Sequence, residues 1–308
     1  MGSFTQGKRL TISMRLAIRH LTSYSYDTSV LSSSQIIRLS PRRDGGQSID
    51  KWSVEAFATL GPGSSPVAVG LLQGTDGHQN ATHLLSIARR HTSSSILAMG
   101  VVQTTRSDGI VGLEDNGLPL AYWLKQTPHT EAGPPVRDLT WSALAGRETR
   151  PDDGGDLWAL HRLMNDVRRR VDYVIGATSV TTTADEAVIR GAGVCQDHAH
   201  VFIAAARFVG IPARYVSGYL WPGHHEVATA SHAWAEAWVS DLGWVGFDPA
   251  NNVRPTEAYV RVAVGLDYFD ASPVRGVRRA GPVNEEMTVT VQVDAVSADI
   301  DVITSPAY

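Results

Sequence analysis

Over the first ~125 residues, apolar and polar positions alternate in short runs, a pattern typical of strands with one buried face. The clearest run is RLAIRHLTSYSY, from Arg15 to Tyr26. Similar runs cover Gln35–Leu39, Trp52–Phe57, Val67–Leu72, His83–Ile87 and Ile96–Gln103. Clusters of Gly, Pro, Ser and Asp separate them, as turns would. We therefore predict an N-terminal β-rich domain over residues 1–125, built as a small sandwich or barrel.

After residue 125 the pattern changes to helical spacing. Residues 126–155 contain four prolines and show no sustained period, so we expect a linker there, with at most a short turn of helix. Residues 156–171 (DLWALHRLMNDVRRRV) place leucines and a methionine at helical spacing. A second, shorter helix is predicted over 183–190, where Thr183 and Glu186 form a capping-box pair. Residues 156–308 are thus predicted to form an α+β core.

The next predicted helix begins at the single cysteine of the chain, Cys195. Apolar residues recur at helical spacing up to Val209, and Gly210 supplies the left-handed end. Gly191 and Gly193 allow close backbone approach just before the first turn. The cysteine therefore lies at a helix N-terminus, where unpaired amides and the helix dipole favour an anion such as a thiolate.

A hairpin is predicted further along the chain. Residues 231–239 (SHAWAEAWV) alternate strictly, and residues 244–248 return after a turn. If Trp238 pairs with Trp244, Asp248 lies on the same face as His232 and diagonal to it, within reach of the imidazole. Asp248 can then orient His232, and His232 can accept the proton of Cys195.

Composition and charge narrow the classes of function. The chain of 308 residues has 43% hydrophobic and 19% charged residues and a net charge of -4, so we expect neither nucleic acid nor a membrane as partner. One cysteine excludes an internal disulfide. We find no apolar run long enough for a signal-peptide core or a bilayer span, and expect a cytoplasmic protein.

Each of the three candidate residues also has a structural interpretation. A lone cysteine is often a small buried hydrophobe, and a histidine on a strand is more often a surface residue. Together, a cysteine at a helix start, a histidine on a strand and a diagonal aspartate favour nucleophilic catalysis by a Cys195–His232–Asp248 triad.

Four segments, GVCQDHAH, GIPARYVSGYL, SHAWAEAWV and GWVGFDPAN, resemble the core of the transglutaminase-like superfamily. HLTSYSY and RLSPR resemble the N-terminal domain of its bacterial members. The resemblance implies a papain-like fold, in which the cysteine helix packs on an antiparallel sheet. It also implies attack on a carboxamide or thioester with an acyl-enzyme on sulfur. The oxyanion would be held by the Cys195 N–H and a second donor, for which Tyr173 is the candidate.

The chain departs from the family pattern at positions that concern the substrate pocket. The family usually has an aromatic residue at His198, a threonine at Ala250 and Gly-Arg-Asp at residues 265–267. We name four candidates for the substrate groove: Asp197, His198, Trp234 and Trp244. Asp197 can instead oppose the helix dipole, and the tryptophans can instead form core. For Arg214 we expect a buried structural ion pair.

Several alternatives stay open. A zinc site could draw on Cys195, His198, His200, His224, His225 and His232. The chain has no C-x-x-C or H-E-x-x-H motif, however, and His198 and His200 would point to different sides of one helix. We therefore expect no metal and no cofactor. The acyl group could pass to water, as in a peptidase or amidase, or to an amine. The substrate would be a peptide, a protein or a small acyl or amine compound, and a non-catalytic binding scaffold is the third possibility.

Overall fold

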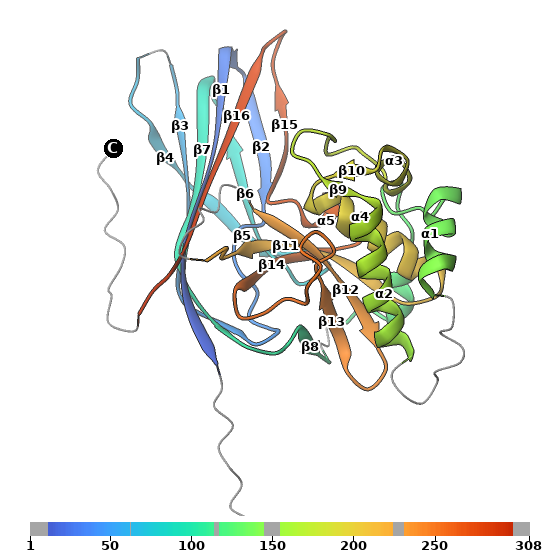
Figure 1. Cartoon of the computed structure of the whole chain (residues 1–308). Helices are drawn as coiled ribbons and strands as arrows, with labels where there is room; N and C mark the ends of the chain where they lie inside the picture. Colours follow the sequence, from blue (N-terminus) through green and yellow to red (C-terminus); the bar gives the residue numbers. More distant parts are fainter. Residues whose placement is uncertain (1–11, 62, 114–116, 145–154, 224–230, 298–308) are drawn as a thin grey trace, which may run out of the picture.

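The structure is a computed structural model that describes residues 12–61, 63–113, 117–144, 155–223 and 231–297. Its strands form a two-sheet sandwich, and its helices cover one face of a separate sheet beside the sandwich (Figure 1). Among the described residues, no helix has the length and apolar character needed to span a membrane. The predicted α+β class, with an N-terminal sheet domain, is confirmed.

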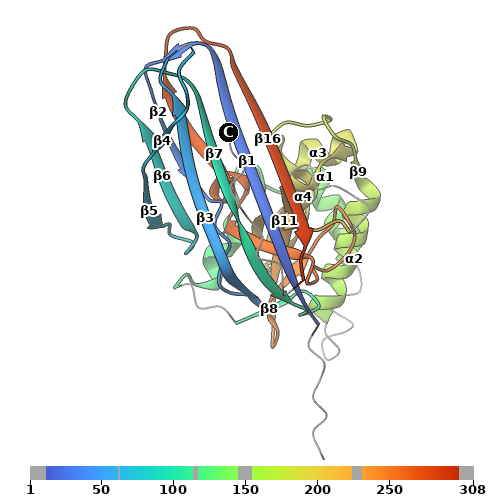
Figure 2. The ribbon, with the colours of Figure 1, turned by 90° about the vertical axis from the view of Figure 1, so that its left-hand side faces the viewer.

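The N-terminal region is a sandwich of two sheets, one of the two architectures that we predicted for it. One has the strand order β16-β1-β7-β3-β4 and the other β15-β2-β6-β5, and Figure 2 shows the two layers. The strands of the first are β1 (Ser13–Val30), β3 (Gln47–Thr59), β4 (Val67–Val69), β7 (His91–Thr105) and β16 (Glu285–Ala295). Those of the second are β2 (Ser32–Ile37), β5 (Leu71–Thr75), β6 (Ala81–Ile87) and β15 (Val274–Arg279). Each predicted run overlaps a strand, but Val67–Leu72, predicted as one strand, is divided at Gly70 between β4 and β5 of different sheets.

The long strands of the sandwich serve two cores. Toward one end, Ile37 and Leu85 meet Ile96 between the two sheets. Toward the other end, Leu16 and Val102 pack with Tyr219, Val260 and neighbouring residues of the helix-covered sheet. The sandwich and the helix-covered region are therefore joined by a shared apolar core.

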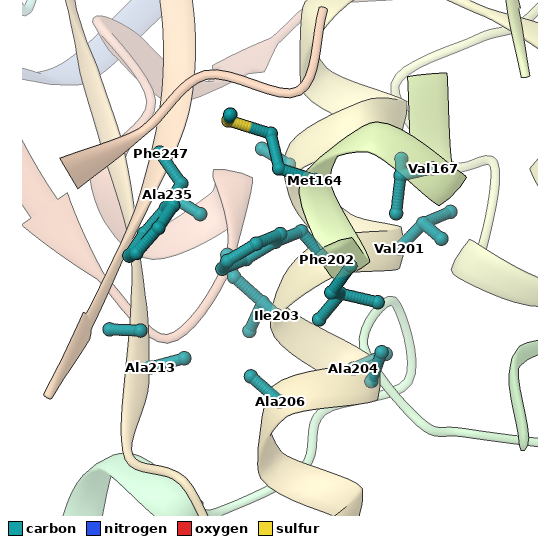
Figure 3. Close-up of a cluster of buried hydrophobic side chains, with 14 of the residues drawn as sticks. Met164, Val167, Val201, Phe202, Ile203, Ala204, Ala206, Ala213, Ala235 and Phe247 are labelled. Carbon is teal, nitrogen blue, oxygen red and sulfur yellow. The ribbon is translucent and has the colours of Figure 1, made fainter. Parts of the chain in front are cut away.

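The helix-covered sheet has the order β14-β11-β12-β13-β8. Its strands are β8 (Ile110–Gly112), β11 (Ala213–Leu220), β12 (His232–Val239), β13 (Gly243–Phe247) and β14 (Tyr259–Gly265). The predicted pairing of Trp238 with Trp244 is confirmed. Alanines of β12 face α4 (Cys195–Phe208), which lets the helix lie close to the sheet (Figure 3).

The other helices surround α4. They are α1 (Pro134–Leu144), α2 (Gly155–Arg170), α3 (Ala184–Arg190), α5 (Tyr268–Ala271) and the 3-10 turn η1 (Leu120–Leu124). Two short strands, β9 (Asp172–Tyr173) and β10 (Ala192–Gly193), pair in parallel just before α4. The predicted capping box of α3 is present: the Thr183 N–H donates to Glu186 Oε2 at 2.8 Å, and the Glu186 N–H donates to Thr183 Oγ1 at 3.3 Å.

Three features depart from the domain boundaries that we predicted. β15 and β16 lie in the predicted core, 156–308, yet they pair with β2 and β1 of the sandwich. β8 lies in the predicted N-terminal domain, 1–125, yet it pairs with β13 of the helix-covered sheet. The predicted linker, 126–155, contains α1, and residues 145–154 of it lie outside the described residues. The exchange of strands across the boundaries depends on long-range pairing, which local periodicity does not contain.

Candidate active site

Cys195 is the first residue of α4, as predicted. The turn before it is fixed by Asp197, whose Oδ2 accepts the Val194 N–H at 2.7 Å and the Thr178 hydroxyl at 2.6 Å. Gly193 is required there, because a Cβ at this position would lie 2.7 Å from the Asp197 Cβ. The helix start thus presents the sulfur beside backbone amides that have no acceptor within the helix.

His232 is the first residue of β12 and lies beside Cys195, whose thiol contributes to the raised pKa of the imidazole. Its Nε2 lies 2.7 Å from Asp248 Oδ2. Since Nε2 is taken by the aspartate, the contact with sulfur falls to Nδ1. The structure therefore brings Cys195, His232 and Asp248 together in the predicted order.

Asp248 is fully buried and accepts hydrogen bonds from two residues that the sequence analysis did not identify. The Tyr259 hydroxyl donates to Oδ2 at 2.8 Å, and Asn251 donates from its side chain at 2.7 Å and from its backbone at 3.2 Å. Asn251 follows the aspartate by three residues in a turn that starts with Asp248-Pro249, and the Asp-Pro pair was a usable turn signal. Tyr259 comes from β14 and has no such local signal.

The protonation of the site follows from these contacts. Burial lowers the pKa of His232, but the hydrogen bonds to Asp248 and Cys195 outweigh burial and raise the pKa to about 10. Burial raises the pKa of Asp248, and the hydrogen bond and charge of His232 reverse the effect, so that the pKa is lowered overall. His232 is therefore held as an imidazolium and Asp248 as a carboxylate at neutral pH.

Tyr173 lies at the end of β9, paired in register with Gly193. Its hydroxyl lies beside Cys195, and the residue is 44% exposed. Burial raises the pKa of Tyr173, and the neighbouring charges of Cys195 and Asp248 raise it further. The hydroxyl therefore stays protonated and available as a donor next to the sulfur.

Two of the four groove candidates are not accessible from solution. Asp197 and His198 are buried at 1% and 0% exposure. Asp197 is occupied by the Val194 amide and Thr178, and both His198 ring nitrogens lie 2.8 Å from backbone carbonyls. The groove prediction for these residues is wrong, because the first turn of α4 packs against β9 and β10 and is covered by them.

The two tryptophan candidates are also buried. Trp234 stacks behind His232, with ring centroids 6.2 Å apart, and Trp244 lies under the Arg214 guanidinium at 4.1 Å. Both belong to an apolar cluster on the sheet face opposite α4, so they are core rather than groove. Arg214 forms the buried ion pair that we expected, with Glu236 at 2.6 Å.

The possible zinc ligands do not converge in the part of the chain that the structure describes. No group of three His, Cys, Asp or Glu side chains there is arranged to hold a metal ion. His198 bonds to carbonyls on one side of α4, whereas His200 Nε2 accepts the Tyr268 N–H at 3.1 Å. His224, His225 and most of the loop 221–230 lie outside the described residues.

Two family models match the chain. Residues 144–249 match the transglutaminase-like superfamily, and residues 16–103 match the bacterial transglutaminase-like N-terminal region. The first range contains Cys195, His232 and Asp248. The second covers most of the sandwich.

Similar proteins are known from several bacteria. An uncharacterized protein of Mycobacterium leprae is 29% identical over 279 residues, which is 85% of this chain and 92% of that protein. A protein-glutamine gamma-glutamyltransferase of Pseudomonas aeruginosa is 34% identical over 82 residues, 24% of this chain and 12% of that enzyme. The solved structure of a candidate cysteine protease from Cytophaga hutchinsonii has a TM-score of 0.70, with 19% identity and 96% of each chain covered. The last similarity establishes a shared fold.

Proposed function

The chain belongs to the transglutaminase-like superfamily through its core and its N-terminal region, and from this we propose that it is a thiol enzyme acting on amide or thioester bonds. One observation carries the proposal: His232 lies beside Cys195 and is hydrogen-bonded to a buried, fully occupied Asp248. A histidine held this way can accept the thiol proton and keep it.

In the first half of the reaction, the Cys195 thiolate attacks the carbonyl carbon and a C–S bond forms. The negative charge that develops on the carbonyl oxygen is met by the Cys195 N–H at the start of α4. Tyr173, whose hydroxyl already lies at the sulfur, is the candidate for the second donor. The imidazolium of His232 then gives its proton to the leaving amine or thiol, and the acyl group stays on sulfur.

In the second half, a nucleophile resolves the thioester. We propose water as the nucleophile: His232, now neutral, takes a proton from water, the hydroxide attacks the acyl carbon, and the C–S bond breaks to release an acid. An amine would follow the same steps and give an amide. The sequence similarity to the glutamyltransferase of Pseudomonas aeruginosa, although confined to 82 residues, favours testing this second version directly.

Trapping the acyl-enzyme tests the proposal. A library of amide and thioester donors is incubated with the full chain, and intact-protein mass spectrometry records a mass increase. We expect an adduct on the native protein, none on Cys195→Ala, and strongly reduced formation on His232→Gln, with His161→Gln on α2 as the control histidine. An adduct on Cys195→Ala, or none on the native protein with any donor, contradicts the proposal.

The fate of the acyl group is measured in the same system with and without an added amine. Equal yields of free acid in both cases support hydrolysis. An amide product at the expense of acid supports transfer to an amine. A Cys195 thiol that reacts with iodoacetamide only near pH ~8.5 or above, as a free cysteine does, would indicate a binding scaffold instead.

A further inference from the structure

His198 is buried from solvent, and each of its two ring nitrogens faces a backbone carbonyl oxygen. Its side chain is fully buried, its Nδ1 lies 2.8 Å from the Val194 carbonyl oxygen, and its Nε2 lies 2.8 Å from the Val171 carbonyl oxygen. A carbonyl oxygen only accepts hydrogen bonds, and a neutral imidazole has only one N–H to donate. Both bonds form together only when the ring carries two N–H groups, that is, as an imidazolium.

We propose, building on the proposed thiol chemistry, that His198 is a permanently charged positioning residue that supports the thiolate of Cys195. The two residues are three apart on α4, a spacing that places side chains side by side on a helix, about 5–6 Å apart at their Cβ atoms. The Nδ1 bond to Val194 draws the ring back toward the residue just before Cys195. The positive charge is therefore fixed at the start of the nucleophile's helix.

A positive charge at this position would offset the negative charge of Asp197. Asp197 caps the helix through the Val194 N–H, and its carboxylate would repel a thiolate at Cys195. Burial raises the pKa of Asp197, while Thr178, the Val194 N–H and the charge of His198 lower it. An imidazolium beside the carboxylate offsets its charge, so the cap is kept without loss of the thiolate.

His198 also supports the other group that contacts the sulfur. The Tyr173 ring lies over the His198 ring, with centroids 6.1 Å apart and planes inclined by 30°. A cation against an aromatic face is attracted by it. The other charged group at this position is Arg168, whose Nη1 donates to the same Val171 carbonyl at 3.5 Å. The imidazolium thus orients the ring whose hydroxyl lies beside Cys195.

His161 offers an internal comparison. It lies on α2 and makes the same Nδ1 bond, to the Leu157 carbonyl at 2.8 Å. Burial lowers the pKa of His161, only partly offset by that bond, so we expect a neutral ring at pH 7. The two histidines share one local motif and differ in the second carbonyl and in the groups around them.

The protonation state is measured by NMR of full-length protein labelled with ¹⁵N in histidine. The two ring nitrogens resonate close together in an imidazolium and far apart in a neutral ring. We expect His198 to show the imidazolium pattern at pH 7 and His161 the neutral one, with signals assigned by their loss in His198→Phe and His161→Phe. A neutral pattern for His198 at pH 7 overturns the proposal, whatever Cys195 does.

The effect on the nucleophile is measured as the rate of Cys195 alkylation by iodoacetamide against pH. We expect His198→Phe to move the midpoint upward by about one pH unit, the usual scale for a nearby opposite charge, and His161→Phe to leave it in place. An unmoved midpoint in folded His198→Phe also overturns the proposal. If His198→Phe does not fold, the NMR measurement on the native protein decides, with the His198 ring signals assigned through their correlations to its backbone. A free-thiol profile in the native protein contradicts the proposed function and the support of a thiolate with it, and the NMR pattern then shows separately whether His198 carries its charge.

Discussion

At the scale of single residues, the candidate site depends on how completely Asp248 is surrounded by donors. A buried carboxylate is costly unless its hydrogen bonds are made. His232, Asn251 and Tyr259 together occupy both oxygens of Asp248. The aspartate therefore stays ionised, and a fixed negative charge keeps the His232 ring oriented toward Cys195.

Replacing Tyr259 by Phe tests this arrangement. The change removes one donor to Asp248 and leaves the ring in place. A hydrogen bond to a charged group contributes about 1.5–3 kcal/mol, so we expect the rate of acyl-adduct formation to fall about tenfold or more. Tyr219→Phe is the control, because its hydroxyl is also buried but bonds to His20 in the sandwich. Equal rates in native protein and Tyr259→Phe would contradict the role.

The raised pKa of His232 predicts a dependence of stability on pH. The folded state binds the proton more tightly than the unfolded chain, whose histidine titrates near pH ~6.5. The stabilisation is therefore complete below that pH and is lost as the pH rises through about 10. Between pH ~6.5 and 10 we expect native protein to lose more than about 1 kcal/mol of unfolding free energy relative to His232→Gln. Parallel urea-denaturation results for the two proteins across this range would contradict it.

The residues of the proposed triad could be predicted because each lies in a pattern that is visible in the local sequence. Cys195 opens an apolar helical period, and His232 belongs to a strictly alternating strand. Tyr259 could not be found this way, since it reaches Asp248 only through the pairing of β14 with β11. Trp234 was placed in the groove because it shares a strand face with His232. Strand β12 begins at His232, which lets the imidazole reach Cys195. Trp234 lies two residues farther along the strand, in the apolar cluster on the sheet face opposite α4.

At the scale of elements, the position of Cys195 depends on how β10 packs against the first turn of α4. The backbone of β10 passes so close to Asp197 that only a glycine fits at position 193. The close approach lets the Asp197 carboxylate bond the Val194 N–H. The glycine before the nucleophile is thus a packing requirement of the helix cap, which refines the sequence-based expectation of close backbone approach.

Gly193→Ala should displace this cap. The new Cβ would lie 2.7–2.9 Å from the Cβ and carboxylate atoms of Asp197, so the backbone at residue 193 or Asp197 must shift. Overpacking of this kind costs about 1–3 kcal/mol. We expect that loss in urea denaturation together with slower alkylation of Cys195. Gly70→Ala is the control, because no atom lies within 4 Å of a Cβ there, and its stability should stay within about 0.5 kcal/mol of native.

Helix α1 shows what element-scale prediction missed. Prolines and the absence of a clear period led us to expect a linker over 126–155. The helix begins at Pro134, and proline is well tolerated in a first helical turn because its missing N–H would have no partner there. The proline pair was therefore a start signal, and only the packing of α1 against α2 and α4 distinguishes it from a linker.

At the scale of the whole molecule, a buried charge network crosses between the sandwich and the helix-covered sheet. Glu236 is fully buried between Arg214 and Arg261, each of which donates from its Nε at 2.7 Å. Arg261 also pairs with Asp44, which follows β2 in the chain. The relative placement of the two regions is therefore fixed by ions as well as by the shared apolar core.

Glu236→Gln should destabilise the whole chain. It removes the carboxylate that the buried Arg214 and Arg261 guanidinium groups share, and removing one partner of a buried ion pair costs about 3–5 kcal/mol. The control is Asp50→Asn, which breaks the partly exposed pair with Arg15 and should cost less than about 1 kcal/mol. Equal losses for both variants in urea denaturation would contradict a structural role of the buried network.

The predicted domain boundaries failed at this scale for a physical reason. The residues of β16 can indicate a strand, but they do not indicate that its partner is β1. Leu16 pairs with Ala295, almost a full chain length away. Such pairings form only after a large loop is closed, so they depend on the assembled molecule rather than on local pattern.

The pairing of β16 with β1 also limits how the gene can be rearranged. A recombination event that carried only residues 16–103 into another protein would deliver a sheet without its outer strand. The backbone groups of β1 that bond to β16 would then be bare, and exposed edges of this kind invite aggregation. The N-terminal region can be inherited as a working unit only if the last strand travels with it.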